Sequence, residues 1–413
     1  MKSVAILGNM NNLGFVWLRY IKELDYSVDL YLFENDCADG LSHFSPKNDT
    51  NNYHLYQRNI HQTNIKNGLV SVSLISELMF LALNAKFNPF TFFKKYKELK
   101  DFKKKIIKTD YVITMGIGPA FLSRFGRCVD LFSPYGLGVD NVETDLMNDS
   151  LRSSNFFRRT LAQYAQNKQI AALKKSRLNI ISDLGLNASA MNKHDIPYNY
   201  DFLPLLYIED GEELSKYAAS NTFTFEHHGR HYWVNDEGYN ESSWRKRTKN
   251  TNLIIDAFKA FLDLNPNSNV KLKLVEYGKD VQSTKKLIEA YGLQDKVQWS
   301  GLLNKNELLK FIKTSTVGIG EFYSTPNTHW GCAGWEVLGM GKPLIQGGYF
   351  GEQNYDEYLS KGVLCANTAE EISNNMNKLY HNKISVKKMN INAYNYFKKY
   401  HNKDYFEKII NDL

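Results

Sequence analysis

The chain has few cysteines, and it lacks a hydrophobic run long enough to cross a membrane. Its 413 residues include 4 cysteines, and none of them forms a CxxC pair. Scattered cysteines of this kind predict reduced thiols and indicate neither a disulfide framework nor a zinc site. The longest apolar stretch, residues 74–85, is interrupted by polar side chains, whereas a membrane-spanning helix needs about 18 apolar residues in succession.

The start of the chain also lacks the features of a secretory signal. After Met1-Lys2 the sequence enters a short strand-like run at residues 4–7 instead of a long apolar core. We therefore predict a cytoplasmic protein. Hydrophobic residues make up 43% and charged residues 23% of the chain, which is typical of a soluble globular protein with room for two domains.

The net positive charge of the chain is concentrated in one segment. Between Lys94 and Lys108 eight lysines face two acidic residues, and a phenylalanine-rich stretch at residues 87–93 precedes them. Such a segment suits the surface of an anionic membrane, where each lysine contributes about 1 kcal/mol. Peripheral contact of residues 87–108 with the inner face of a membrane is one interpretation; a solvated helix face after a core-packing aromatic cluster is the other. Nucleic-acid binding is disfavoured, because the aromatics are not interleaved with the lysines.

Strand-like and helix-like segments alternate along both halves of the chain. Strands are predicted at residues 4–7, 28–33, 111–114, 129–132 and 178–181 of the first half, and at 223–226, 270–275, 297–299, 316–319 and 343–346 of the second. A break at residues 197–217, rich in prolines and acidic residues, separates the two series.

This alternation predicts an α/β protein of two Rossmann-like, doubly wound domains that face each other across a cleft. We place the first domain at residues 1–205 and the second at 206–384. A C-terminal helix at 385–413 is expected to cross back and pack on the first domain. Ligands of such sheets bind at the carboxyl ends of the strands, so the cleft is the expected site.

The segment 316–343 carries the strongest functional signal. A buried strand leads through Gly320 and Glu321 to a short helix that contains Glu336 and ends at Gly341-Lys342-Pro343. The amino end of a helix presents free N–H groups and partial positive charge, which favour a diphosphate. Glu336, further along the helix, could accept hydrogen bonds from vicinal hydroxyls such as those of a ribose. A core helix with a solvated Glu336 is the alternative.

Five motifs of the second half resemble, in family order, those of glycosyltransferase family 4 of the GT-B fold. They are His228-Gly229-Arg230, residues 249–258, residues 270–278, residues 295–301 and residues 336–343. The resemblance implies a GT-B enzyme with an acceptor-binding first domain and a second domain that binds a nucleotide sugar.

The resemblance also implies that Arg230 and Lys249 form the basic pair that holds the donor diphosphate. Two fixed cations would stabilise the negative charge that develops on the departing nucleoside diphosphate, so we count both as catalytic candidates. Plain surface charge is the alternative. Glu336 matches the second glutamate of the family's E-x7-E signature, which binds the ribose.

Thr328 replaces the first glutamate of this signature, the residue that contacts the transferred sugar in the family. The sequence therefore leaves the donor sugar open. We expect Thr328 and His329 to contact sugar hydroxyls or phosphate, and amide groups near Gly331 to neutralise the leaving group. Glu321 could supply a carboxylate from the strand end; a role in capping the loop is the alternative.

Two turns of the first half are candidates for the acceptor side. Gly14 ends the turn between the first strand and the first helix, where it would let a substrate approach the helix closely. The spacing there is not GxGxxG, so neither a nicotinamide nor a flavin site is indicated. Residues 133–140 follow a later strand, where family members carry an acceptor loop; a plain proline–glycine turn is the alternative. From this loop we select Asp140 as a catalytic candidate and Tyr135 and Gly136 as acceptor contacts.

Metal ions and cofactors are not expected. No D-x-D motif, which GT-A enzymes use to hold a divalent ion, occurs in the sequence. His227 and His228 are not interpreted as metal ligands, because no third ligand lies at a recognisable spacing.

We thus predict a cytoplasmic hexosyl- or related glycosyltransferase of bacterial cell-surface glycan biosynthesis (capsule, lipopolysaccharide or glycoconjugate), acting on a glycan or lipid-linked acceptor. Thr328 keeps a non-catalytic GT-B partner subunit open as an alternative, and a nucleotide-sugar epimerase is a second.

Overall fold

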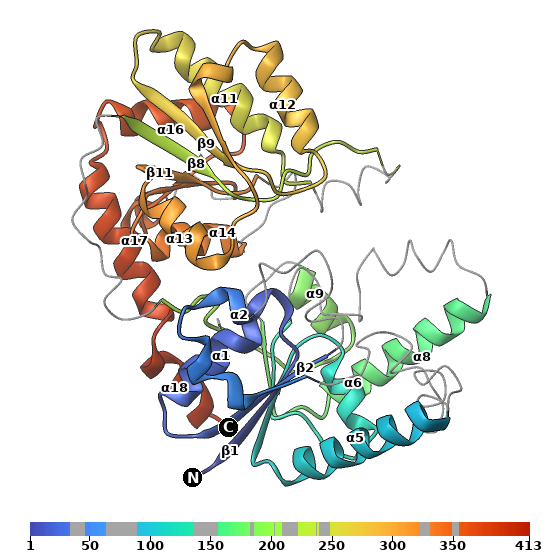
Figure 1. Ribbon diagram of the computed structural model, residues 1–413. Helices are drawn as coiled ribbons and strands as arrows, with labels where there is room; N and C mark the ends of the chain where they lie inside the picture. Colours follow the sequence, from blue (N-terminus) through green and yellow to red (C-terminus); the bar gives the residue numbers. More distant parts are fainter. Residues whose placement is uncertain are drawn as a thin grey trace. The chain divides into compact units, whose positions relative to one another are not determined.

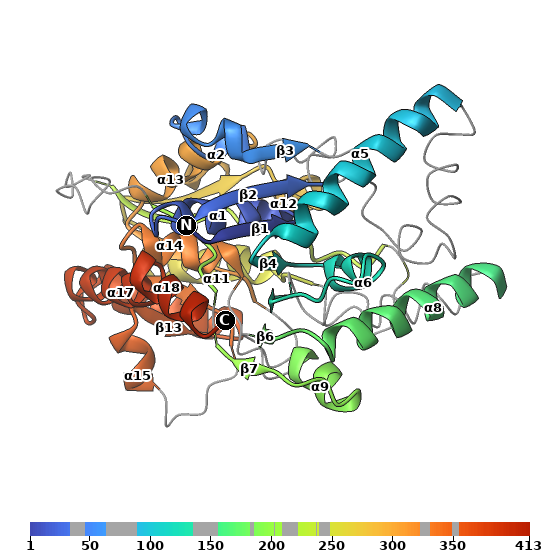
Figure 2. The same cartoon turned by 90° about the horizontal axis from the view of Figure 1, so that it is seen from below.

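The structure, a computed structural model, describes residues 1–33, 46–62, 89–134, 156–181, 186–201, 203–208, 222–236, 238, 248–322, 331–348 and 355–413. The chain forms two compact units: Met1–Tyr207 together with Asn402–Leu413, and Ile208–His401. Figures 1 and 2 show the elements of each unit from two directions. The division lies close to the boundary predicted at residue 205.

Parallel strands form the sheet of the first unit. Within the described residues their order is β3-β2-β1-β4-β5-β6-β7, and every pairing is parallel. The strands are β1 (Ser3–Leu7), β2 (Ser27–Leu32), β3 (Ile60–Gln62), β4 (Tyr111–Thr114), β5 (Leu131–Phe132), β6 (Leu178–Ile181) and β7 (Asn199–Tyr200).

Both faces of this sheet are covered by helices. Val4 and Ile6 of β1 belong to one buried cluster, and Ala5 and Leu7 belong to another, because successive side chains of a strand point to opposite faces. The first cluster includes α1 (Leu13–Lys22) and α18 (Lys403–Asn411). The second includes α5 (Pro89–Lys108), α6 (Gly118–Ser123), α8 (Phe156–Leu173) and α9 (Leu186–Lys193). A short helix, α2 (Pro46–Asp49), precedes β3.

The second unit repeats this architecture. The described strands follow the order β10-β9-β8-β11-β12-β13, and all are parallel. The strands are β8 (Phe223–His227), β9 (Val270–Val275), β10 (Val297–Ser300), β11 (Val317–Ile319), β12 (Leu344–Gln346) and β13 (Val363–Cys365). The helices are α11 (Thr251–Leu264), α12 (Val281–Ala290), α13 (Lys305–Lys313), α14 (Cys332–Gly339), α15 (Tyr355–Ser360), α16 (Ala369–Tyr380) and α17 (Val386–Tyr400).

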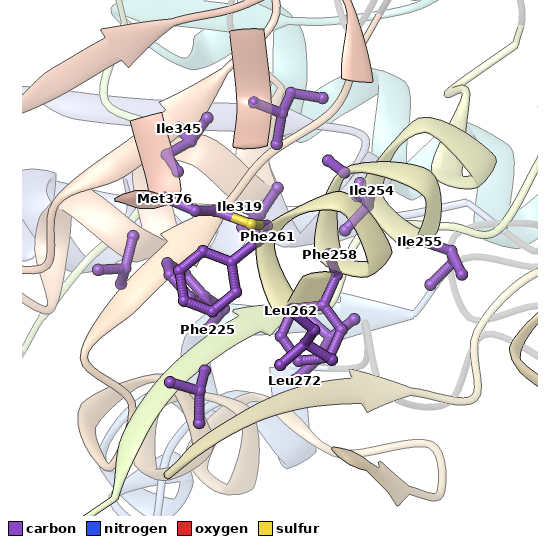
Figure 3. Close-up of a cluster of buried hydrophobic side chains, with 14 of the residues drawn as sticks. Phe225, Ile254, Ile255, Phe258, Phe261, Leu262, Leu272, Ile319, Ile345 and Met376 are labelled. Atoms are coloured by element: carbon purple, nitrogen blue, oxygen red, sulfur yellow. The ribbon is translucent and has the colours of Figure 1, made fainter. Parts of the chain in front are cut away.

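The core of the second unit lies between its sheet and the helices α11 and α16. In Figure 1, α11, α12 and α16 lie on one face of the sheet, while α13 and α14 lie on the other. Phe258 and Phe261 of α11 pack with Phe225 of β8, Ile319 of β11 and Met376 of α16, as Figure 3 shows. Burial of apolar side chains on the sheet explains why each strand carries hydrophobic residues that could be recognised in the sequence.

The C-terminal segment corrects one detail of the prediction. It forms two helices instead of one, and they belong to different units. α17 contacts α14 and α15 in the second unit, whereas α18 packs on α1 of the first. The break is stabilised by Asn402, whose side chain accepts a hydrogen bond from Tyr405 N at 2.8 Å and so caps the amino end of α18.

Candidate functional site

The residues selected from the second half lie at the carboxyl edge of the second sheet. β8 lies between β9 and β11, and Arg230, Tyr277 and Glu321 each follow one of these three strands. Burial raises the pKa of Tyr277, and the charges of Arg230, Glu321 and Glu336 also act on it. These side chains, from separate segments of the chain, therefore gather around one position.

Arg230 and Lys249 are both anchored to Tyr232. The guanidinium Cζ of Arg230 lies 5.3 Å from the centre of the Tyr232 ring, a cation–π contact. The backbone N–H of Lys249 donates to the Tyr232 carbonyl at 2.7 Å. The side chain of Arg230 is exposed, while the Nζ of Lys249 donates to Glu321 Oε2 at 2.7 Å. The structure thus joins the two cations through one residue, with Glu321 beside Lys249.

Gly278 keeps the Arg230 segment in place. Its φ is +115°, a conformation that L side chains rarely adopt. A Cβ at this position would lie 2.4 Å from the His231 carbonyl oxygen and 2.9 Å from Arg230 Cγ. His231 N donates to the Tyr277 carbonyl at 2.7 Å, so the loops after β8 and β9 are fastened together at the base of Arg230.

Glu336 belongs to a buried chain of alternating charges. Its Oε2 accepts from His228 Nε2 at 2.9 Å, and the other ring nitrogen of His228, Nδ1, donates to Glu226 Oε2 at 2.9 Å. Glu336 Oε1 accepts from the ammonium of Lys305, the first residue of α13. Glu336 is therefore not a freely solvated carboxylate, and that part of the alternative interpretation is wrong.

These contacts set the protonation of both groups. Burial alone would lower the pKa of His228, but Glu226 and Glu336 outweigh it and raise that pKa to about 10. Burial alone would raise the pKa of Glu336, but Lys305 and His228 outweigh it and lower that pKa to about 2. At neutral pH His228 is an imidazolium and Glu336 is a carboxylate that can only accept hydrogen bonds.

The amino end of α14 lies next to this cluster. Its N-cap residue is Gly331, which has no side chain to accept hydrogen bonds from the first turn. The first N–H groups of a helix have no partner within it and favour an anion. Burial raises the pKa of the Cys332 thiol to about 12, so a thiolate does not oppose a negatively charged ligand here.

Several predicted site residues lie outside the described part of the chain. On the donor side these are Thr328 and His329, and on the acceptor side Asp140, Tyr135 and Gly136. Their predicted contacts remain predictions.

Gly14 lies inside the first turn of α1, where it is buried, and not in the turn that precedes the helix as predicted. A Cβ there would lie 2.1 Å from the Gly8 carbonyl oxygen and 2.9 Å from Leu30 Cδ1. The close approach that calls for glycine is therefore made by the chain's own backbone. Contact between this turn and an acceptor stays a prediction.

Three residues of the charged cluster were missed as site residues in the sequence. Glu226 gave a signal, because a carboxylate stood inside a predicted strand, next to Phe225; it is fully buried. His228 stood inside a motif chosen for its neighbour Arg230. Lys305 gave no signal, because a lysine at the start of a helix is ordinarily solvated.

The lysine-rich segment forms most of α5. Leu99, Phe102 and Ile106 point into the core of the first unit, while Phe90 and Phe93 have exposed fractions of 89% and 69%. These two rings are not the core-packing aromatics of the alternative interpretation. No helix in the part of the chain described by the structure is both long and apolar enough to span a bilayer.

Comparison with known families and structures agrees with the architecture. Residues 244–396 match the model of the family described as glycosyl transferases group 1. A search of curated protein sequences gave no match.

Solved structures resemble the whole chain. HepE from Anabaena, in complex with UDP and glucose, has a TM-score of 0.60 at 15% identity, covering 100% of this chain and 99% of HepE. Sucrose-phosphate synthase from Thermosynechococcus elongatus has a TM-score of 0.57 at 12% identity, covering 100% and 98%. WaaG, a glycosyltransferase involved in lipopolysaccharide biosynthesis, has a TM-score of 0.55 at 13% identity, covering 98% and 99%. The GT-B fold predicted from the sequence is confirmed.

Proposed function

We propose that this chain, a GT-B protein whose C-terminal half is a group 1 glycosyltransferase domain, transfers a sugar from a nucleoside diphosphate sugar to an acceptor hydroxyl. The observation that carries the proposal is the joining of Arg230 and Lys249 through Tyr232, beside the amino end of α14 and the carboxylate of Glu336. Cations and helix N–H groups suit a diphosphate, while an acceptor-only carboxylate suits the hydroxyls of a ribose.

The proposed chemistry is electrostatic. When the bond between the sugar and the diphosphate breaks, negative charge grows on the departing phosphate oxygen. Arg230, Lys249 and the N–H groups at the start of α14 would stabilise this charge from fixed positions, and such preorganised groups can contribute several kcal/mol to lowering a barrier. Glu336 would hold the nucleoside still. The reaction as proposed uses no metal ion or other cofactor.

A thermal-shift panel of nucleoside diphosphates and nucleotide sugars tests the donor side. A ligand at 100 times its Kd should stabilise the chain by about 2.7 kcal/mol. Arg230→Ala should reduce the shift strongly. Lys259→Ala is the matched control, because Lys259 is a surface cation of the same unit, paired with Asp263 on α11. A panel without any shift, or an equal loss in both variants, would contradict the proposal.

Turnover assays separate the proposal from its alternatives. Release of nucleoside diphosphate that depends on an added acceptor supports sugar transfer. Binding without any release supports the non-catalytic partner subunit that Thr328 suggests. Conversion of the donor sugar without an acceptor, followed by NMR, supports an epimerase.

The finer part of the proposal places this activity in bacterial cell-surface glycan biosynthesis, at the inner face of the membrane. Two observations support it. The similar structures include WaaG and the lipopolysaccharide outer core galactosyltransferase WaaB. In addition, α5 exposes Phe90 and Phe93 next to its lysines, which suits an anionic bilayer surface.

Sedimentation with vesicles of anionic lipid tests the membrane contact. Replacing four lysines of α5 with glutamine should abolish binding, and four replacements on α17 should leave it unchanged. The α5 set is Lys97, Lys100, Lys104 and Lys105; the α17 set is Lys387, Lys388, Lys398 and Lys399. Equal binding by both variants would refute the membrane contact and leave the donor chemistry untouched.

A further inference from the structure

We propose that His228 is a positioning residue for the donor nucleoside. It holds the carboxylate of Glu336 in the orientation that accepts hydrogen bonds from ribose hydroxyls, and Glu226 in turn holds His228. This inference rests on the proposed function, because it concerns the nucleoside of the donor.

The first step of the argument is the geometry of the imidazole. Both ring nitrogens of His228 lie 2.9 Å from a carboxylate oxygen, one of Glu226 and one of Glu336. A carboxylate only accepts hydrogen bonds, and a neutral imidazole has a single N–H. Both contacts are hydrogen bonds only when the ring carries two protons. The ring is then fixed at both ends, and its plane determines where Glu336 Oε2 lies.

The second step is the position of Glu226. Its side chain is fully buried in the strand β8, so it cannot touch a ligand. A buried carboxylate is costly unless it is paired. Glu226 has positively charged neighbours. His228 is bonded to it, and Lys273 and Lys342 lie close enough for their charges to interact with it. Among the described residues, His228 is the side chain that hydrogen-bonds both Glu226 and Glu336, so Glu226 acts on Glu336 through His228.

The third step is the capacity that remains on Glu336. A carboxylate offers about four lone-pair sites. His228 uses one on Oε2 and Lys305 uses one on Oε1, so the contacts of the described residues leave one site on each oxygen. The side chain keeps an exposed fraction of 10%. Two acceptor sites on neighbouring oxygens match the two donor hydroxyls of a ribose, provided that the carboxylate does not rotate.

The experiment measures how strongly the protein distinguishes a ribose from a deoxyribose. Calorimetric titrations with UDP, GDP, ADP and CDP identify the nucleoside diphosphate that binds most tightly, and its 2′-deoxy form is then titrated. The wild-type chain should prefer the ribose form by about tenfold, as expected when a hydrogen bond to a charged group is lost. In His228→Gln this preference should fall towards one.

Two further variants make the result specific. Glu226→Gln keeps the shape of the side chain and an oxygen that accepts from His228 Nδ1, so it should fold and reduce the preference partly. If circular dichroism shows that His228→Gln does not fold, Glu226→Gln alone tests the inference. His227→Gln is the matched control: His227 is equally buried in β8, but its Nδ1 bonds the Ile319 carbonyl and no carboxylate. It should lower the melting temperature and leave the preference unchanged.

The possible outcomes separate this inference from the proposed function. A wild-type preference that disappears in His228→Gln or falls in Glu226→Gln, and persists in His227→Gln, supports the inference. A full preference in folded His228→Gln or Glu226→Gln overturns it, as does an equal loss in the control. Equal wild-type binding of both nucleotide forms also overturns it, while diphosphate binding by the chain stands. If no nucleoside diphosphate binds, the proposed function fails and the inference falls with it.

Discussion

One helix of each unit follows a glycine-containing turn, and the amino ends of these two helices are capped differently. At α1 of the first unit, Asn9 Oδ1 accepts from Phe15 N at 2.8 Å, and the Gly8 carbonyl oxygen fills the space beside Gly14. At α14 of the second unit, the N-cap is Gly331, which brings no side-chain acceptor. The first helix end is closed by the chain's own groups, whereas the second has no side-chain cap among the described residues.

The buried charges of the two units also differ in whether they reach the surface of the protein. In the first unit Arg19 pairs with Asp49 at 3.3 Å and packs against the Tyr207 ring, where it joins α1 to its surroundings. In the second unit the buried chain of Glu226, His228 and Glu336 reaches a carboxylate that keeps an exposed fraction of 10% and also bonds Lys305. A buried ion pair that ends inside the fold serves packing. One that ends at the surface can act on a ligand.

The largest expected effect is a change in the stability of the chain with pH, caused by the buried charges of the second unit. The pKa of His228 is raised from 6.5 to about 10, so its stabilisation is complete below pH 6.5 and is lost as the pH rises through about 10. The pKa of Glu336 is lowered from 4.5 to about 2, so its stabilisation is complete above pH 4.5 and is lost as the pH falls through about 2. Each loss should be on the order of a few kcal/mol. Urea unfolding between pH 2 and 10 measures both losses.

His228→Gln provides the check on this prediction. It should be less stable than the wild type at pH 6 and should show a smaller loss between pH 7 and 10. If both chains lose the same stability over that range, the imidazolium is not the source of the alkaline change.

A second prediction concerns Gly278→Ala, which should affect both stability and donor binding. The substitution places a Cβ at a φ of +115°, against the His231 backbone and Arg230 Cγ. We expect a loss of about 1–3 kcal/mol in the free energy of unfolding and about tenfold weaker nucleoside diphosphate binding, as a charge-assisted contact is misplaced. Denaturant unfolding and calorimetry measure the two effects. Unchanged affinity in a destabilised variant would separate Arg230 from the donor.

Gly14→Ala is the counterpart in the first unit and should affect stability alone. Its Cβ would lie 2.1 Å from the Gly8 carbonyl oxygen, so the turn must shift. Overpacking of this kind costs about 1–3 kcal/mol, while the affinity for a nucleoside diphosphate should not change. A higher KM for the acceptor, at unchanged donor affinity, would instead indicate that this turn is part of the acceptor site.

The smallest expected effect is that of Asn9→Ala. Removing the side chain that bonds Phe15 N should cost about 1 kcal/mol of stability, as for other helix caps. Donor affinity should stay at the wild-type value, as measured by the same titration. A loss of donor binding would show that the two helix ends do not differ as argued above.

The sequence alone was sufficient for the architecture of both units. β1, β2, β4 and β8–β12 are short segments rich in apolar residues, and their alternation with helices allows few topologies. β3, β7 and β13, of two or three residues each, were missed. The division of the C-terminal segment was missed as well, although Asn402 is a favourable N-cap residue, because amphipathic character continues on both sides of it.

The site was only partly predictable. Arg230, Lys249 and Glu336 were selected from motifs, and the structure gathers them at one sheet edge. The contact between His228 and Glu336 joins residues that are 108 positions apart, and neither spacing nor periodicity reports such a pair.

What the amino-acid order determined by itself is local: which segments are strands and helices, and which glycines and charges follow each strand. Hydrophobic periodicity and turn chemistry act over a few residues, so these features can be found in a single sequence. Only the tertiary structure decided which of those charges meet. Burying Glu226, His228 and Glu336 together makes each one's protonation depend on the other two, and that dependence arises from distances in space that the order of residues does not state.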